Sequence, residues 1–325
     1  MVKRENIAFE TIPAAGIHGV GLRSLPGNIL RLTRGFFASR KILNTFKPDV
    51  LFFTGGFVAV PMALAGIPYQ SVLYVPDIEP GLALKTIARY SDHIALTTPE
   101  STKFFNRNKR ISITGYPTRA DLKDWSKQKA AQLFSLSGNK PVVLIIGGSK
   151  GARSINLAVQ AQLDQLLAMA EVIHITGQLD FPSAEASREM LSEEQKASYH
   201  LYPYLHDIGA ALAAADLAVS RAGASTLGEY PQFGLPAILV PYPYAWRYQK
   251  VNADYLAGHG AAVVLEDARL KDDLLPLVKS LLSDPQKLTD MGKSALSLSR
   301  PDAAQKIAEI VSQLSNKNEG RSVRW

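Results

Sequence analysis

The chain has 325 residues, 46% hydrophobic and 20% charged, which is ordinary for a globular protein and long enough for two domains. It contains no cysteine, which excludes disulfides and thiolate metal sites, and no apolar run reaches the roughly 20 residues of a membrane-spanning helix. Residues 1–120 hold 15 Lys and Arg against 7 Asp and Glu, within a net charge of +7 for the whole chain. This basic first part indicates an anionic partner, or simply a soluble surface.

The first part of the chain alternates short apolar runs with helical stretches. Strands are predicted at residues 7–12, 49–54, 71–75, 92–97 and 110–114. Residues 21–43 mix Leu, Ile and Phe with a basic set consisting of Arg23, Arg31, Arg34, Arg40 and Lys41. This segment is predicted to be an amphipathic helix packed on the sheet, or to face an anionic membrane surface.

Glycine and charged residues follow the strands of this first part. Gly55 and Gly56 come directly after residues 49–54, and Asp77 and Glu79 follow residues 71–75. Ligands bind at the carboxyl ends of parallel strands, so the two glycines are candidates for the acceptor side of a site. Arg119 lies near the end of this part, where its guanidinium could face a diphosphate.

A second series of strands is predicted at residues 142–147, 171–177, 216–220, 237–241 and 261–265. Continuous apolar strands that alternate with helices indicate parallel sheets covered on both faces, so the doubly wound α/β pattern occurs twice. We expect a first domain over 1–122, a linker over 123–140 and a second domain over 141–300. A helix and tail over 301–325 complete the chain, with Pro301 in the first turn.

The strongest local motif is GGSKGAR, between a buried strand and a helix that should begin near Ala152. Gly147, Gly148 and Gly151 allow tight turns and close approach of a ligand, and Ser149 offers a hydroxyl. The free N–H groups of the helix terminus suit a diphosphate. The spacing differs from that of the dinucleotide fingerprint and of the Walker A loop. A plain strand-to-helix turn is the alternative interpretation.

The second motif, SRAGASTLGE, also follows a predicted strand. Gly223 suits a turn with positive φ or close ligand contact, and Ser225 or Thr226 could cap the next helix. Ala224, between them, is a further candidate for donor binding. Glu229 falls in the first turns of that helix, where its carboxylate could accept hydrogen bonds from a ribose diol. It could equally be an ordinary solvated helix residue.

The third motif, RYQKVNA, opens a helix after a loop rich in Pro and Tyr. Gln249 and Asn252 are three residues apart and share a face, so their amides could bind sugar hydroxyls. Arg247 could reach a phosphate.

Metal and nucleic-acid sites are not predicted. There is no Asp-x-Asp motif, and the six histidines are scattered. His174 lies within a predicted strand and is expected to be a hydrogen-bonded core residue. The aromatic residues of the basic part do not alternate with basic ones, as a stacking platform for nucleic acid would require.

Over about residues 7–300 the chain resembles the MurG family of glycosyltransferases. The resemblance rests on the three motifs above together with TGGFVAVP and GYPTRADL. The resemblance implies GT-B architecture and inverting, metal-independent transfer of N-acetylglucosamine from UDP-N-acetylglucosamine to a lipid-linked muramyl-pentapeptide. It also implies peptidoglycan precursor synthesis in the cytoplasm, peripherally on the inner face of the membrane, without a cofactor.

The resemblance also assigns roles to individual residues. Ser149 and its glycine neighbours would hold the UDP diphosphate with help from Arg119, and Glu229 would bind the uridine ribose. Gln249 matches one of two paired glutamines that contact the donor sugar, and Tyr248 stands at the position of the other.

Two departures from the family bear on the first domain. The first strand of the family and its glycine-rich loop ending in His have no counterpart here, so we expect that domain to be incomplete. Tyr74, Val75, Pro76 and Asp77 replace a His-Glu-Gln-Asn acceptor motif. The acceptor is therefore open, and the catalytic base is unknown, with Asp77 and Glu79 as candidates.

Three other functions remain possible on the sequence. The chain could be a non-catalytic nucleotide-sugar-binding protein or subunit, a UDP-sugar transferase with a different acceptor, or a UDP-sugar epimerase.

Overall fold

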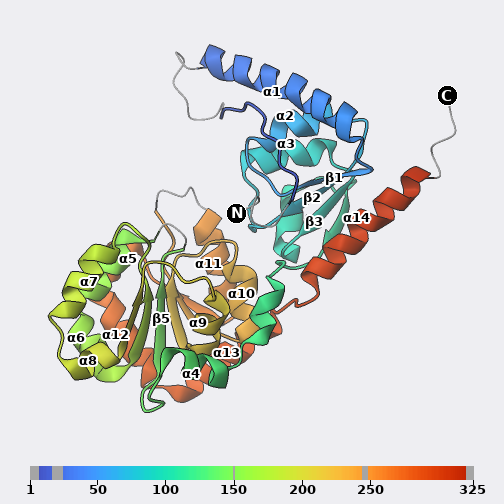
Figure 1. Cartoon of the computed structure of the whole chain (residues 1–325). Coiled ribbons are helices and arrows are strands. Elements are labelled where there is room, and N and C mark those ends of the chain that lie inside the picture. The colour runs from blue at the N-terminus through green and yellow to red at the C-terminus, as the bar shows by residue number, and fades with distance from the viewer. Residues whose placement is uncertain (1–6, 17–24, 149–150, 244–247, 320–325) are drawn as a thin grey trace, which may run out of the picture. The chain divides into compact units, whose positions relative to one another are not determined.

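A computed structural model describes residues 7–16, 25–148, 151–243 and 248–319 (Figure 1). The chain forms two compact units, one of residues Met1–Thr114 with Ala304–Trp325 and the other of Gly115–Ala303. Both units contain a parallel sheet with helices, which confirms the predicted α/β fold. Among the helices of the described residues, none has both the length and the apolar character that crossing a bilayer requires.

The first unit is built on four parallel strands in the order β1-β2-β3-β4. Their bounds are β1 Val50–Phe53, β2 Gln70–Val75, β3 His93–Leu96 and β4 Arg110–Ile113. The helices are α1 Leu25–Phe46, α2 Ala59–Ala65, α3 Leu82–Tyr90 and α14 Ala303–Glu319, with a 3-10 turn at Pro99–Phe104. The core consists of residues such as Leu73, Ile87 and Ile94, which are fully buried. Burial of β2 and β3 on both faces explains the apolar runs over residues 72–75 and 94–96.

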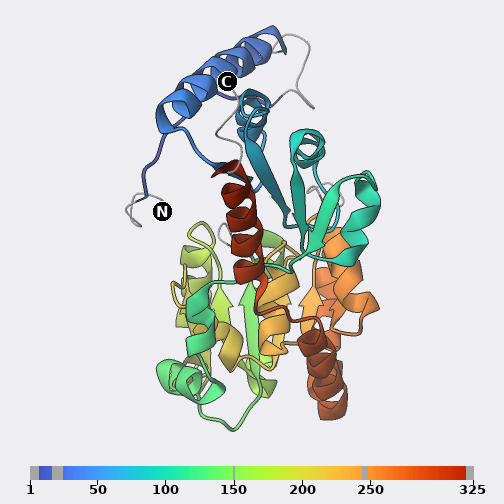
Figure 2. The ribbon, with the colours of Figure 1, turned by 90° about the vertical axis from the view of Figure 1, so that its right-hand side faces the viewer.

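The strand predicted at residues 7–12 is wrong, because residues 7–16 have no regular secondary structure. This segment contacts α1 instead, since a Cβ added to Gly35 of α1 would lie 2.1 Å from the carbonyl oxygen of Pro13. Helix α1 itself packs on α2 and is the long blue helix in both views (Figure 1, Figure 2).

The second unit is built on six parallel strands in the order β10-β9-β8-β5-β6-β7. Their bounds are β5 Val142–Ile146, β6 Glu171–Ile175, β7 Tyr199–Tyr202, β8 Leu217–Ser220, β9 Ala237–Leu239 and β10 Ala262–Val264. The helices are α4 Lys127–Phe134, α5 Arg153–Gln160, α6 Leu163–Met169, α7 Phe181–Glu189, α8 Glu193–Ala197, α9 Ile208–Ala214, α10 Thr226–Phe233, α11 Tyr248–Gly258, α12 Leu270–Leu282 and α13 Pro285–Ser297.

The strand order of the second unit reverses between β5 and β8. The chain runs outward through β5, β6 and β7, and then returns to place β8 on the other side of β5. The helices form two packed groups, one containing α5, α6 and α12 and the other containing α4, α9 and α10. In such sheets ligands bind at the carboxyl ends of the strands beside the reversal, so the loops after β5 and β8 are where a site is expected.

Candidate functional site

A cavity of about 320 Å³ lies at the carboxyl ends of β5 and β8. It is lined by Ile146, Gly147, Gly148, Ile208, Leu212, Ser220, Arg221, Gly223, Ser225, Thr226, Glu229, Tyr230 and Gln249. Several of the residues predicted from the sequence therefore converge on one hollow, although they come from three separate motifs. Its volume is in the range of small-molecule sites.

The glycines after β5 are required by the backbone. Gly147 has no room for a side chain, since a Cβ there would lie 2.2 Å from the amide nitrogen of Ala152. Gly148 has a φ of +85° with open space beside it, and Gly151 has a φ of +78°. Ala152 takes the N-cap position of α5, as predicted, without a side-chain cap. Ser149 lies outside the described residues. This turn presents open space and a helix terminus, which suits an anionic ligand.

The turn after β8 also lines the cavity. Gly223 has open space beside it, which permits close approach of a ligand, but it does not have the positive φ expected as one option. Ser225 takes the N-cap position of α10 without capping the helix, and Thr226 donates to the carbonyl of Gly223 at 2.7 Å. The predicted cap is therefore wrong, because both hydroxyls bond elsewhere: that of Ser225 meets the Glu229 carboxylate. Ala224 completes the turn.

Glu229 is a half-buried carboxylate at the edge of the cavity. Burial raises its pKa, while the hydrogen bond with Ser225 and the positive charge of Arg119 act in the opposite direction. Arg119 itself is exposed, donates to the carbonyl of His206 at 3.3 Å and pairs with Asp121 at 3.3 Å. It contributes charge near Glu229 and is not among the residues that line the cavity.

The two amides of α11 have different environments. Gln249 lines the cavity, and its Oε1 accepts the N–H of Tyr242 at 2.8 Å. Asn252 is completely buried, and its amide donates to the carbonyl of Ala222 at 3.2 Å. The expected shared face is therefore not seen at the cavity, because Asn252 supports the backbone of the turn after β8. Arg247 lies outside the described residues.

The sequence interpretation missed Arg221, which lines the cavity and connects the loop after β8 to α5, to the loop after β9 and to the turn after β10. It pairs with Asp267, donates to Ser154 at 2.7 Å and to the carbonyl of Val240 at 3.2 Å, and stacks 5.1 Å over the ring of Tyr242. The sequence did contain a signal for this role, because a single Arg directly after a buried apolar strand needs hydrogen-bond or ion-pair partners.

The candidates of the first unit follow its strands as predicted. Gly55 and Gly56 come after β1 with φ values of +109° and +82°, and Gly55 packs on Leu84. Of the two acidic residues after β2, Asp77 is half-buried. Glu79 is 4% exposed and lies 4.0 Å from the amine of Lys85. Within the ranges that the structure describes, no group of three or more His, Cys, Asp and Glu side chains could hold a metal ion.

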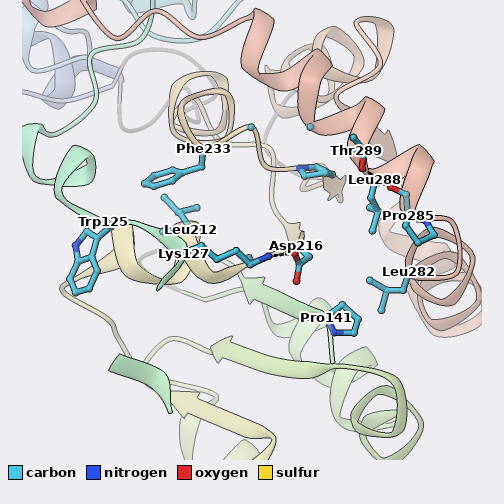
Figure 3. A pocket seen from close by; sticks show the side chains of 15 residues that line it. Trp125, Lys127, Pro141, Leu212, Asp216, Phe233, Leu282, Pro285, Leu288 and Thr289 are labelled. Carbon is cyan, nitrogen blue, oxygen red and sulfur yellow. Dashed lines mark hydrogen bonds and ion pairs between the residues drawn. The ribbon is translucent and has the colours of Figure 1, made fainter. Parts of the chain in front are cut away.

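A larger hollow of about 730 Å³ lies at the opposite edge of the second sheet (Figure 3). Its lining includes Pro141, Asp216 and Pro236, which precede β5, β8 and β9. Lys127 forms an ion pair with Asp216 there, and Trp125 and Phe233 supply apolar surface. None of the residues predicted to bind the donor lines this hollow, so the smaller cavity is the candidate site.

Known families match both parts of the chain. The glycosyltransferase family 28 N-terminal domain matches residues 1–96, and the glycosyltransferase family 28 C-terminal domain matches residues 142–307. A relative from Roseiflexus sp. (strain RS-1) is 38% identical, over 97% of this chain and 80% of the relative. One from Listeria monocytogenes serovar 1/2a is 35% identical, over 96% and 86%. Both are named UDP-N-acetylglucosamine--N-acetylmuramyl-(pentapeptide) pyrophosphoryl-undecaprenol N-acetylglucosamine transferase.

Two solved structures are similar in fold. The crystal structure of Acinetobacter baumannii MurG has a TM-score of 0.73 and 23% identity, and the match covers 96% of this chain and 86% of that one. The UDP-GlcNAc 2-epimerase from Neisseria meningitidis bound to UDP-GlcNAc has a TM-score of 0.64 and 14% identity, with 91% and 83% covered.

Proposed function

Because the chain belongs to glycosyltransferase family 28, we propose that it transfers N-acetylglucosamine from UDP-N-acetylglucosamine to a lipid-linked muramyl-pentapeptide acceptor. The named activity of its relatives at 33–38% identity is this transfer. We assign it to the synthesis of a peptidoglycan precursor, as the family resemblance implies.

One observation carries the donor half of the proposal. The turn after β5, the turn after β8 and Glu229 line one cavity beside the strand reversal of the second unit. The glycine turn and the terminus of α5 would receive the diphosphate, since unpaired N–H groups and the helix dipole favour anions. The Glu229 carboxylate would accept hydrogen bonds from the ribose diol, and Gln249 would meet the donor sugar.

We propose the inverting transfer that the family resemblance implies. The oxygen of an acceptor hydroxyl attacks the anomeric carbon on the face opposite the diphosphate and inverts that carbon. The carbon–oxygen bond to the diphosphate breaks, and UDP leaves with the electron pair. The terminus of α5 stabilises the negative charge that develops on the leaving group, so no metal ion is required.

The hydroxyl proton passes to a base, for which we propose Asp77. Both acidic candidates follow β2, but Glu79 is 4% exposed and Asp77 is half-buried, so Asp77 is the more accessible carboxylate. Gly55 and Gly56 would line the acceptor side.

We also propose that α1 contacts the membrane that carries the lipid-linked acceptor. Its exposed side chains include Leu30, Phe37 and Phe46 together with a basic set made up of Arg31, Arg34, Arg40 and Lys41. Apolar side chains mixed with basic ones bind anionic lipid surfaces. Arg23 lies outside the described residues.

The test is a transfer assay with radiolabelled UDP-N-acetylglucosamine, a lipid-linked muramyl-pentapeptide and anionic vesicles, with and without EDTA. We expect a labelled lipid product and free UDP in both conditions. No product, with an active family 28 enzyme as the positive control, would contradict the proposal. Turnover of UDP-N-acetylglucosamine without any acceptor would instead indicate epimerase chemistry, the activity named for a structurally similar protein.

A further inference from the structure

Three buried polar side chains form a continuous line inside the second unit. They are Tyr199 of β7, His174 of β6 and Asn156 of α5, and their exposures are 1%, 0% and 0%. The Tyr199 hydroxyl lies 2.8 Å from His174 Nδ1, and His174 Nε2 lies 3.0 Å from Asn156 Oδ1. Buried polar groups cost free energy of folding unless each is hydrogen-bonded. The hydrogen-bond partners of these three side chains therefore determine which parts of the backbone the line holds in place.

The partners fix the direction of each hydrogen bond. Asn156 Nδ2 donates to the carbonyl of Thr176 at 2.9 Å and to the carboxylate of Asp180 at 2.8 Å. Both are acceptors, so the amide oxygen must face His174, and His174 Nε2 must carry a proton. Burial lowers the pKa of His174 to about 3, so the ring is neutral and its Nδ1 accepts from the Tyr199 hydroxyl.

The same line supports the glycine turn of the candidate site. The carbonyl oxygen of Thr176 would lie 2.1 Å from a Cβ on Gly151, so Gly151 rests directly on the atom that Asn156 binds. Asn156 also belongs to α5, which begins two residues after Gly151. The Asn156 amide therefore connects α5 to the Thr176 carbonyl, which follows β6 and contacts Gly151.

We propose that Tyr199, His174 and Asn156 are positioning residues that hold the turn around Gly151 and the first turns of α5 in the geometry that receives the donor diphosphate. The inference rests on the proposed function, because it assigns that turn to the diphosphate. The three side chains are buried beneath the site and act through the backbone that they hold, without touching the donor.

The test compares the calorimetric affinity of UDP with that of uridine, which lacks the diphosphate. Tyr199→Phe removes one hydroxyl and keeps the ring, and His174→Leu removes both ring hydrogen bonds. We expect each to weaken UDP binding by about tenfold, which corresponds to one or two lost hydrogen bonds, and to leave uridine binding within about twofold. His174→Gln can donate at one end and accept at the other, so it should restore most of the UDP affinity.

A matched control lies at the other end of the same strand. Glu171 of β6 is 1% exposed and accepts from the Ser137 amide and hydroxyl at 2.9 and 2.7 Å. Its other oxygen lies 3.3 Å from His200 Nε2. Glu171→Gln disturbs this partly buried hydrogen-bond cluster at the amino end of β6, whereas the turn lies at the carboxyl end. It should lower the thermal midpoint without selectively weakening UDP.

The outcomes separate this inference from the proposed function. Failure of the unaltered protein to bind UDP would overturn the donor assignment and this inference with it. Two results would overturn only the positioning role, provided that the unaltered protein binds UDP. In the first, Tyr199→Phe binds UDP equally well. In the second, its affinities for UDP and for uridine fall by the same factor. A readout on the unaltered protein does not depend on any variant folding: ¹⁵N shifts of the His174 ring should show the neutral Nε2–H tautomer, and a protonated Nδ1 would contradict the hydrogen-bond line.

Discussion

The guanidinium of Arg221 donates a 2.7 Å hydrogen bond to the hydroxyl of Ser154, and that hydroxyl donates in turn to the carboxylate of Asp267 at 2.7 Å. Arg221 also pairs with Asp267 directly. The three side chains join the loop after β8, the first turn of α5 and the 3-10 turn that follows β10. The side chains of Arg221 and Asp267 are only 10% and 22% exposed, so breaking their pair should cost more than breaking a surface ion pair.

We predict that Arg221→Lys lowers the thermal midpoint of the protein. Lysine keeps the charge but cannot bond Ser154, Asp267 and the carbonyl of Val240 at the same time. The free energy of unfolding should therefore fall by about 2 kcal/mol, and the thermal midpoint by several degrees. Arg269→Lys is the control, because Arg269 is 65% exposed and pairs with Asp273 only four residues along the chain, so this ion pair should contribute little. Circular dichroism melts measure both variants, and equal losses would contradict the role of Arg221.

A second prediction concerns the space beside Gly148. Gly148→Ala places a Cβ at a φ of +85° in open space, and Gly138→Ala does the same at a φ of +73° outside the candidate site. Both should lose a similar amount of stability, about 1–2 kcal/mol, from the left-handed backbone. Only Gly148→Ala should also weaken UDP binding, by about tenfold or more, because its methyl group fills ligand space. Calorimetric titration with UDP distinguishes the two, and equal affinities would remove Gly148 from the site.

A third prediction concerns the Glu229 carboxylate. Glu229→Gln keeps the shape of the side chain but removes the charge that would accept two hydrogen bonds from the ribose diol. We expect UDP affinity to fall by about 10- to 100-fold, in the range of hydrogen bonds to charged groups. The affinity for UDP should fall much more than that for ribose-free pyrophosphate. A uniform loss for both ligands would argue against a ribose contact.

The pH dependence of UDP binding tests the same contact. Burial raises the pKa of Glu229 above 4.5, so lowering the pH protonates this carboxyl earlier than an exposed glutamate. Protonation replaces an acceptor by a donor, so UDP affinity should decrease as the pH falls toward that raised pKa. The Glu229→Gln variant should lack this decrease, and identical pH profiles would contradict the assignment.

The elements that surround the site could be predicted from sequence because their signals are local. β5 and β8 are continuous apolar runs followed by glycine-rich turns, and α5 begins at the predicted place. β7 was missed because it is a four-residue strand, half-buried over most of its length, that pairs only with β6 at the sheet edge. Residues 7–12 have an apolar pattern but no neighbouring strand within the described residues, and a strand needs a partner.

The side-chain partners of the site were less predictable because they depend on long-range packing. The sequence places Asn252 on a face with Gln249, but which face of α11 meets the turn after β8 is decided by tertiary contacts. Ser154 and Asp267 are 113 residues apart, so no local pattern could reveal their contact through Arg221. In contrast, the expectation that His174 is a hydrogen-bonded core residue is confirmed, since a His within a buried strand must find partners.

A fourth prediction separates the two acidic residues after β2. Asp77→Asn should lower kcat by about 100-fold or more with little change in the KM for UDP-N-acetylglucosamine, as expected for loss of a general base. Glu79→Gln should mainly lower stability, because the carboxylate is buried next to Lys85. Steady-state kinetics and thermal melts of both variants check this. Normal kcat in Asp77→Asn with a large loss in Glu79→Gln would transfer the proposed role to Glu79.

The last prediction concerns the pH dependence of stability. The pKa of His174 is lowered from 6.5 to about 3 by burial, so the unfolded chain binds a proton at this residue between these pH values and the folded protein does not. The unfolded state is then favoured as the pH falls, by up to about 1.4 kcal/mol per pH unit. Between pH 7 and pH 5 the unaltered protein should lose about 2 kcal/mol more than His174→Gln, which cannot take up the proton. Urea unfolding at the two pH values measures the difference, and the comparison cancels the contribution of the other histidines. Equal losses in the two proteins would mean that the His174 ring is protonated in the folded state, which is incompatible with accepting the Tyr199 hydroxyl at Nδ1.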